Sequence, residues 1–159
     1  MQKITVLSVG NDKESYFAEA VNEYKKRLSR FAQPELVLLR DEPIPENPSE
    51  KETEEILKKE GRRLLDAAPA GAVKIALCVE GKEVSSEELA ALLEDCAASA
   101  PGAAFFIGGS LGLSEEVKAA CRYRLSFSRL TFPHRLMRVI LFEALYRAKS
   151  ISAGAKYHK

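Results

Sequence analysis

The sequence lacks any run of the roughly 18 uninterrupted apolar residues that a membrane-spanning helix requires. Its first residues, MQKITVLSVGND, turn polar too soon for a secretory signal. We therefore expect a cytoplasmic protein that does not enter a membrane. The sequence also lacks internal repeats and long low-complexity linkers. Its 159 residues, 46% of them hydrophobic, favour one globular domain over residues 1–159.

Cysteine is scarce. The three cysteines, Cys78, Cys96 and Cys121, are odd in number, widely spaced and set among apolar residues. This pattern suits reduced thiols in a core better than disulfides or a metal knuckle. We therefore expect no metal and no thiol chemistry.

Acidic residues are nearly missing from the last part of the chain. Residues 117–159 contain ten Lys or Arg against one acid, Glu143, which is a net charge of +9; the overall charge of +1 then leaves −8 for residues 1–116. Such asymmetry is typical of a surface that binds a polyanion, because each neutralised phosphate releases counterions. The alternative is that the two parts pair with each other, within the fold or across a dimer.

Strands and helices alternate along the chain. Apolar runs predict strands at 3–9, 35–40, 72–79, 103–108 and 123–128. Helical periodicity and start signals predict helices at about 12–31, 50–67, 85–98, 114–121 and 133–149. The run at 72–79 is apolar throughout, as in a strand covered on both faces. With no tight hairpin signal, this order predicts an α/β sandwich around a parallel sheet.

Local signals predict where several helices begin. Ser49 with Glu52, and Ser85 with Glu88, have the spacing of capping boxes, in which each side chain binds a backbone N–H left unpaired at the helix start. Thr131 is a candidate N-cap for the closing helix.

The closing helix contains LMRVILFEALYRA, which is apolar on nearly every side. A helix that is hydrophobic all round is a buried helix. The last helix of a small domain needs something else to cover it, so we predict a homodimer.

Residues 105–114, FFIGGSLGLS, place a glycine turn after a strand, where ligands bind in parallel sheets. The glycine spacing matches neither the dinucleotide fingerprint nor the phosphate loop. Glu115 and Glu116 follow in the first turn of the next helix and would repel a phosphate. A ligand without phosphate, and with positive charge, fits better; the alternative is a close-packed turn that binds nothing.

Two further stretches are candidates for function. The loop SRLTFPH follows the last strand and could form one pocket with the glycine turn. His134 in this loop is either a structural histidine or a catalyst. The terminal AGAKYHK is either a frayed end or a contact with an RNA base.

Three motifs, IGGSLGL, LSFSRLTFPHRLMRVILFEALYRA and the terminal GAKYHK, resemble the RlmH family of SPOUT-class enzymes. The likeness extends to KITVLSVG at the start and KEG at 59–61. The resemblance implies a C-terminal trefoil knot, an exception to usual topology, and S-adenosylmethionine as a cofactor bound between two protomers. It also implies methylation of N3 of a pseudouridine, position 1915 in the usual numbering, in 23S rRNA of assembled ribosomes. Arg129 and Leu130 stand where many relatives have Lys and Met.

Carried over by position, the resemblance assigns cofactor contacts to two loops and one strand end. These residues are Leu77, Gly108, Phe127, Ser128, Arg129, Leu130, Thr131 and Phe132.

The resemblance and the chemistry together suggest catalytic roles. His158 would handle the N3 proton from the partner's tail, Tyr157 would hold or stack the base, and Arg138 with Lys159 would contact phosphate or the developing anion. Further RNA contacts are expected from Lys118, Arg122, Arg124 and Arg135. The alternative function is a nonenzymatic RNA-binding or ribosome-assembly protein on the same fold.

Overall fold

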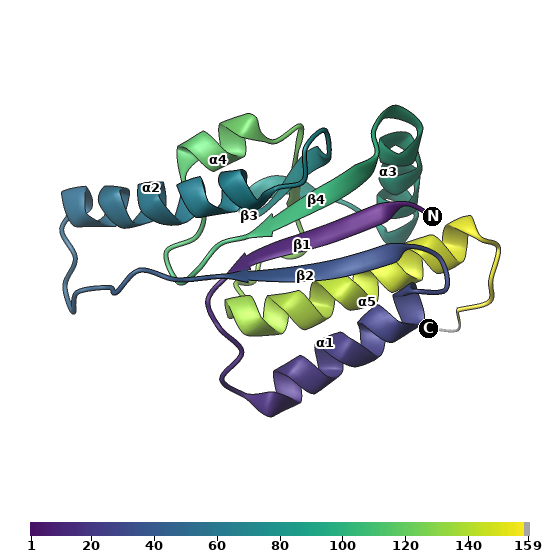
Figure 1. The fold of residues 1–159 in the computed structure, drawn as a ribbon, viewed down its shortest axis with the longest axis horizontal. Coiled ribbons are helices and arrows are strands. Elements are labelled where there is room, and N and C mark those ends of the chain that lie inside the picture. Colours follow the sequence, from purple (N-terminus) through teal and green to yellow (C-terminus); the bar gives the residue numbers. More distant parts are fainter. Residues whose placement is uncertain (158–159) are drawn as a thin grey trace.

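A computed structural model describes residues 1–157, and its centre is an all-parallel sheet in the order β2-β1-β4-β3-β5 (Figure 1). The strands are β1 (Lys3–Val9), β2 (Gln33–Leu39), β3 (Val73–Glu83), β4 (Gly102–Ile107) and β5 (Tyr123–Ser126). The helices are α1 (Ser15–Leu28), α2 (Glu50–Ala67), α3 (Ser86–Ser99), α4 (Glu115–Ala120) and α5 (His134–Ser152). The predicted α/β sandwich is confirmed, and the trefoil knot stays a prediction.

Helices cover both faces of the sheet. α1, α3 and α5 pack on one face and α2 and α4 on the other, each over its own apolar core. Neighbouring strand residues alternate between the cores: Ile75 and Phe105 face α5, while Ala76 and Phe106 face α2. All four are fully buried, as predicted for strands covered on both sides.

Both predicted capping boxes are present. At α2, Glu52 N donates to Ser49 Oγ (3.1 Å) and Ser49 N donates to the Glu52 carboxylate (3.2 Å). At α3, the corresponding distances between Ser85 and Glu88 are 3.1 and 2.7 Å. These reciprocal bonds explain why both helix starts could be read from four residues of sequence.

β3 extends beyond its predicted end at residue 79 and continues to Glu83. Leu77 pairs with Leu125 of β5, and after an irregular segment Lys82 pairs with the same residue. Such a bulge leaves residues out of the ladder and redirects the chain. Residues 78–81 are thereby placed at the carboxyl edge of the sheet.

α5 is covered largely by its own chain. It lies on the sheet between α1 and α3, and Leu141, Phe142 and Leu145 are fully buried there. Leu136 and Ile140 stay half-buried. Neighbours within the chain therefore account for much of the apolar character of α5, and the homodimer stays a prediction.

The start of α5 differs from the prediction. The helix begins at His134, Pro133 occupies the N-cap position, and no side chain caps it. The prediction of Thr131 as the N-cap is therefore wrong, because Thr131 lies in the loop before Pro133.

Among the helices of residues 1–157, none combines the length and apolar character needed to cross a bilayer.

Candidate functional site

A pocket of about 680 Å³ lies at the carboxyl edge of the sheet, between the ends of β3, β4 and β5. This volume is in the range of small-molecule sites. The glycine turn and the loop after β5 both line it, as predicted, although β3 lies between their strands. Of the eight predicted cofactor residues, seven line the pocket: Leu77, Gly108, Phe127, Ser128, Leu130, Thr131 and Phe132. Arg129 does not line it and is exposed.

The glycine turn is closed by its own backbone. Gly112 N donates to Gly109 O (3.0 Å), and the two residues form an antiparallel bridge. Gly112 has a φ of +84°, which favours glycine. At Gly108 a Cβ would overlap the Gly112 carbonyl group and come within 3.0 Å of its Cα. The turn therefore requires glycine at both positions and presents main-chain atoms to the pocket.

Acidic residues lie near the glycine turn, but among them only Glu80 lines the pocket. Ser114 Oγ accepts from Val117 N (3.2 Å) at the start of α4, whose first turn holds Glu115 and Glu116. Lys118 also lines the pocket, but its side chain is only 12% exposed and pairs with Glu80 and Glu115. The hydrogen bond from Lys118 lowers the pKa of the Glu80 carboxyl. Lys118, the only Lys or Arg of the described lining, is thus already neutralised, so the pocket offers no free Lys or Arg to a phosphate.

Hydroxyl groups shape the loop after β5. Ser126 Oγ donates to Ser128 O (2.9 Å), and Leu130 N donates to Ser128 Oγ (2.9 Å). The chain therefore turns at Ser128, which ends β5 two residues before the predicted end at 128. The Leu130 side chain is 71% exposed. An exposed leucine on the wall of a pocket is suited to contact with a ligand or a second protein surface.

The segment Cys78–Glu80 lines the pocket, and sequence reasoning did not include it. The continuous apolar run at 72–79 hid the bulge, because it is typical of an uninterrupted strand.

The three cysteines are free. Burial raises the pKa of Cys121 to about 11, so this thiol is protonated at neutral pH. Within residues 1–157 no group of His, Cys, Asp or Glu side chains is arranged to hold a metal ion.

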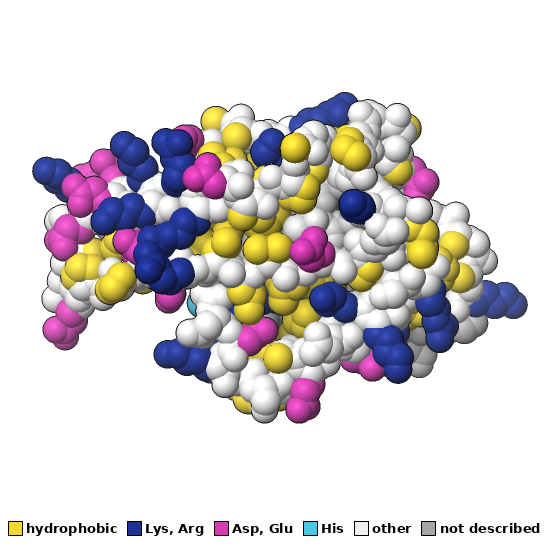
Figure 2. All heavy atoms as spheres, in the orientation of Figure 1, with side chains coloured by type: hydrophobic (Ala, Val, Ile, Leu, Met, Phe, Trp, Pro, Cys, Tyr) yellow, Lys and Arg dark blue, Asp and Glu magenta, His cyan; other side chains and the backbone are white. Residues whose placement is uncertain are grey.

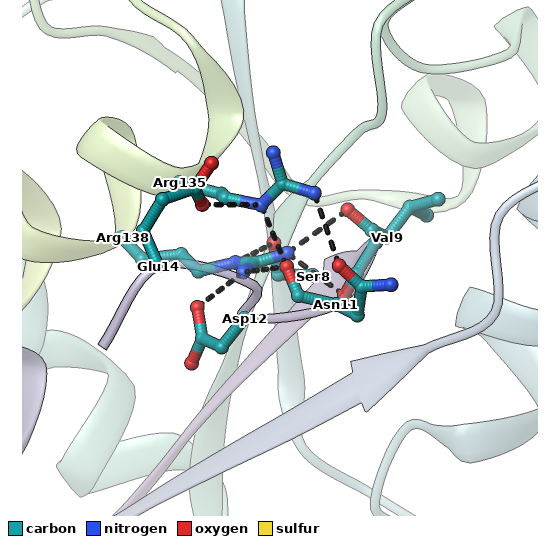
Figure 3. Close-up of polar contacts among 8 residues, drawn as sticks. Ser8, Val9, Asn11, Asp12, Glu14, Arg135 and Arg138 are labelled. Atoms are coloured by element: carbon teal, nitrogen blue, oxygen red, sulfur yellow. Dashed lines mark hydrogen bonds and ion pairs between the residues drawn. The ribbon is translucent and has the colours of Figure 1, made fainter. Parts of the chain in front are cut away.

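Arg138 is fully buried below the pocket and ties α5 to the end of β1 (Figure 3). All five of its N–H groups donate hydrogen bonds of 2.7–3.2 Å. The acceptors are Ser8 Oγ, Asp12 Oδ1 and the carbonyl oxygens of Val9, Gly10 and Asn11. This network also explains why α1 starts at Ser15 rather than near residue 12, since Asp12 is engaged elsewhere.

The network leaves Arg138 no N–H for an RNA phosphate in this arrangement. The predicted contact of Arg138 with RNA stays a prediction, and we assign it a positioning role instead. Its neighbour Arg135 donates to Asn11 O (2.7 Å) and Asn11 Oδ1 (3.0 Å) and lies 3.4 Å from Glu14 Oε2. Two arginines of α5 therefore fix the loop between β1 and α1.

Replacement of Arg138 by methionine is expected to lower the free energy of unfolding by about 3 kcal/mol or more, because Asp12 and Ser8 would lose a buried partner. Arg138→Lys keeps the charge but not the planar fork, so we expect a smaller loss. Chemical denaturation of the three proteins measures both values. An Arg138→Met protein as stable as the parent would contradict the assignment.

His134 lines the pocket at the start of α5, with its ring against Gly10. Its Nε2 is buried and, among residues 1–157, has no hydrogen-bond partner. Burial lowers the pKa of His134, and the guanidinium groups of Arg138 and Arg135 lower it further. The ring is therefore neutral near pH 7, and its unpartnered Nε2 is buried beside Gly10.

The lowered pKa predicts how stability depends on pH. Below about pH 6.5 the unfolded chain protonates His134, while the folded chain does so only at lower pH. The unfolded state then binds more protons, so the free energy of unfolding falls as pH drops below about 6.5. His134→Asn should flatten this decline between pH 5 and 6.5, measured by denaturation across the range. Parallel curves for the two proteins would contradict the prediction.

Comparisons with known proteins agree with this geometry. The family described as "Predicted SPOUT methyltransferase" matches residues 2–158. Ribosomal RNA large subunit methyltransferase H of Clostridioides difficile (strain 630) is 48% identical over 157 residues, which cover 98% of this chain and 99% of the relative. The protein of that name from Clostridium novyi (strain NT) is 50% identical with the same coverage.

The chain belongs to the RlmH family of SPOUT methyltransferases. Solved structures show the same fold at low identity. A probable methylase family protein from Haemophilus influenzae Rd KW20 has a TM-score of 0.52 at 14% identity, covering 99% of this chain and 70% of its own. TrmJ from Z. mobilis ZM4 has a TM-score of 0.55 at 11% identity, and the match covers 93% of this chain and 70% of the TrmJ chain.

In this RlmH-family protein, the cations predicted to bind RNA are dispersed. Arg122 is exposed, stacks on Tyr123 and bonds Ser99 Oγ (3.5 Å), and the exposed Arg124 donates to Lys118 O (3.2 Å). Lys118 and Arg135 are held in ion pairs. The predicted RNA contacts of these residues stay predictions.

Tyr157 of this RlmH-family protein packs against its own α5. Tyr157 donates to Glu143 Oε1 (3.0 Å), packs edge-on against Tyr146 (4.8 Å) and lies under Arg147 (4.4 Å). Glu143 is nine residues after His134, or about 13 Å along the helix. His158 and Lys159 lie outside the described residues. Tyr157 is therefore held against the middle of α5, about two and a half turns from the helix start at the pocket.

Proposed function

We propose that this protein transfers a methyl group from S-adenosylmethionine to N3 of a pseudouridine in 23S rRNA, at position 1915 as the family resemblance implies. The observation that carries the proposal is a pocket lined by seven of eight expected cofactor residues, in a chain that matches relatives named for large-subunit rRNA methylation over nearly their full length.

The pocket suits this cofactor chemically. S-adenosylmethionine has a positive sulfonium and no phosphate, and it supplies an electrophilic methyl group when bound. Phe127 and Phe132 offer apolar surface, and Lys118, the only Lys or Arg of the described lining, is paired with Glu80, so the pocket offers no free cation to a phosphate. Main-chain groups of the glycine turn can bind polar edges. These features support the cofactor over a nucleotide phosphate.

The chain's own residues would align the reaction and exclude water. N3 is a poor nucleophile while protonated, so a base that accepts its proton helps by roughly 10² to 10⁴ in rate. We assign this step to His158, with Tyr157 holding the base. His134, which lines the pocket and whose buried Nε2 has no hydrogen-bond partner among residues 1–157, is the second candidate. A His134→Ala protein that loses turnover while His158→Ala stays active would reverse the assignment.

The anchoring of Tyr157 away from its own pocket supports a site shared by two protomers. While Tyr157 keeps its contact with Glu143, about 13 Å along α5 from His134, it does not reach the pocket at the start of the same helix. We therefore propose a homodimer in which each tail completes the partner's site, acting on assembled ribosomes in the cytoplasm.

The test is transfer of a tritium-labelled methyl group from S-adenosylmethionine to ribosomes that lack the modification, followed by mapping of the labelled base. Fully modified ribosomes are the control, and they should accept no label. Label on another base would overturn the assigned substrate. Calorimetric titration with S-adenosylmethionine tests the alternative, because a nonenzymatic RNA-binding protein would give no binding.

A further inference from the structure

A group of cations lies on α2, away from the residues predicted to bind RNA. Lys58, Lys59, Arg62 and Arg63 of α2 line a groove together with Glu55, and Arg40 follows β2 beside them. We name these five cations the α2 basic patch. Figure 2 shows Lys and Arg side chains gathered over this part of α2. The patch belongs to the part of the sequence with a net charge of −8, which is why a sum over residues 1–116 conceals it.

Part of this charge is already used within the fold. The Glu42 carboxylate lies 3.6 Å from Lys59 Nζ and 2.7 Å from Arg63, which also donates to Arg40 O (3.0 Å). Lys58 and Arg62 are exposed, and within residues 1–157 neither forms an ion pair. They are four residues apart, so both project from one side of the helix. The patch therefore offers two cations that form no ion pair within residues 1–157, next to Lys59 and Arg63, which Glu42 holds in place.

Lys58 and Arg62 of the α2 basic patch lie on the helix that packs against the glycine turn, on the exposed side opposite Glu60. Glu60, on the same helical turn, is buried, accepts a hydrogen bond from Glu42 N (2.9 Å) and would be 3.4 Å from a Cβ on Gly109. The middle of α2 thus lies against the glycine turn that lines the pocket. Figure 1 shows α2 running past the carboxyl ends of β1 and β4. A nucleic acid with one base in the pocket would pass along this flank.

We infer that the α2 basic patch binds the phosphate backbone of the RNA substrate next to the target nucleotide, with Lys58 and Arg62 as its principal contacts. This inference rests on the proposed function, since it assumes an RNA substrate for the pocket. The described pocket lining holds no Lys or Arg other than the paired Lys118, so cations outside the pocket would attract the polyanion. Each phosphate neutralised releases counterions, so the contribution depends on salt.

The test compares Lys58→Gln/Arg62→Gln with Lys26→Gln/Arg30→Gln, an equally exposed pair four residues apart on the other side of the sheet. Methyl transfer to unmodified ribosomes is measured from 50 to 200 mM salt. The α2 double variant should raise the KM for ribosomes about tenfold and reduce the slope of log affinity against log salt by about 1.4. The affinity for S-adenosylmethionine should stay unchanged, and the control pair should behave as the parent.

The outcomes separate this inference from the function on which it rests. If the parent protein transfers no methyl group, the proposed function fails. If the parent is active and the α2 double variant matches the control pair, the α2 inference alone fails. A raised KM with an unchanged salt slope would also overturn it, because the loss of two phosphate contacts must reduce counterion release.

Discussion

A protein that lacks Tyr157 to Lys159 is expected to transfer methyl groups at least about 10³-fold more slowly, because it loses both the proposed proton acceptor and the side chain that holds the base. None of the described residues after Met137 lines the pocket, so the Kd for S-adenosylmethionine should change by less than a factor of two. Labelled methyl transfer and calorimetry measure the two effects separately. Retained turnover would exclude the tail from catalysis.

A site shared by two protomers leads to a second prediction for the truncated protein. Coexpression with a subunit whose pocket is inactive, Gly108→Val, should restore activity, because mixed dimers pair one intact pocket with one intact tail. Half of the dimers are mixed and each has one complete site, so about a quarter of the parent activity should return. The absence of any recovery would show that the tail does not serve a partner's pocket.

Gly108→Val is itself expected to weaken S-adenosylmethionine binding at least about 100-fold, which corresponds to about 2.7 kcal/mol. A side chain at this position overlaps the backbone of Gly112, so the turn that lines the pocket must move. Backbone atoms cannot yield as a flexible side chain does. Calorimetric titration measures the loss.

The matched control is Ser110→Ala in the same turn, where the side chain is exposed and no backbone shift is required. Its effect on the Kd should stay within a few-fold. Thermal unfolding of both variants distinguishes a damaged pocket from an unfolded protein. Parent-like affinity in folded Gly108→Val would show that the ligand binds away from the glycine turn.

The features that sequence predicted well are those encoded locally. The capping boxes at Ser49 and Ser85 depend on contacts within four residues, and the apolar runs mark strands covered on both faces. The seven pocket residues came from the family resemblance rather than from spacing alone. The bulge at 78–81 was missed because it depends on pairing between β3 and β5.

Arg138 shows why roles are harder to predict than elements. Its position in a basic, apolar helix suggested contact with RNA, yet its five acceptors lie 126–130 residues away in sequence. No local pattern reveals such partners. The net charges of residues 1–116 and 117–159 misled for a related reason. They count Lys118 among the free cations, although Glu80 neutralises it, and they conceal Lys58 and Arg62.

The hydrogen bonds of Arg138 also affect when the protein can fold during its synthesis. The carbonyl oxygens that end β1 are among the first made by a translating ribosome, and their donor emerges only after more than a hundred further residues. Until Arg138 emerges, the carbonyl oxygens at the end of β1 lack their hydrogen-bond donor. Contacts between residues so far apart in the sequence form slowly. Chaperones that bind nascent chains should therefore protect this protein through most of its synthesis, and its maturation should follow release rather than accompany elongation.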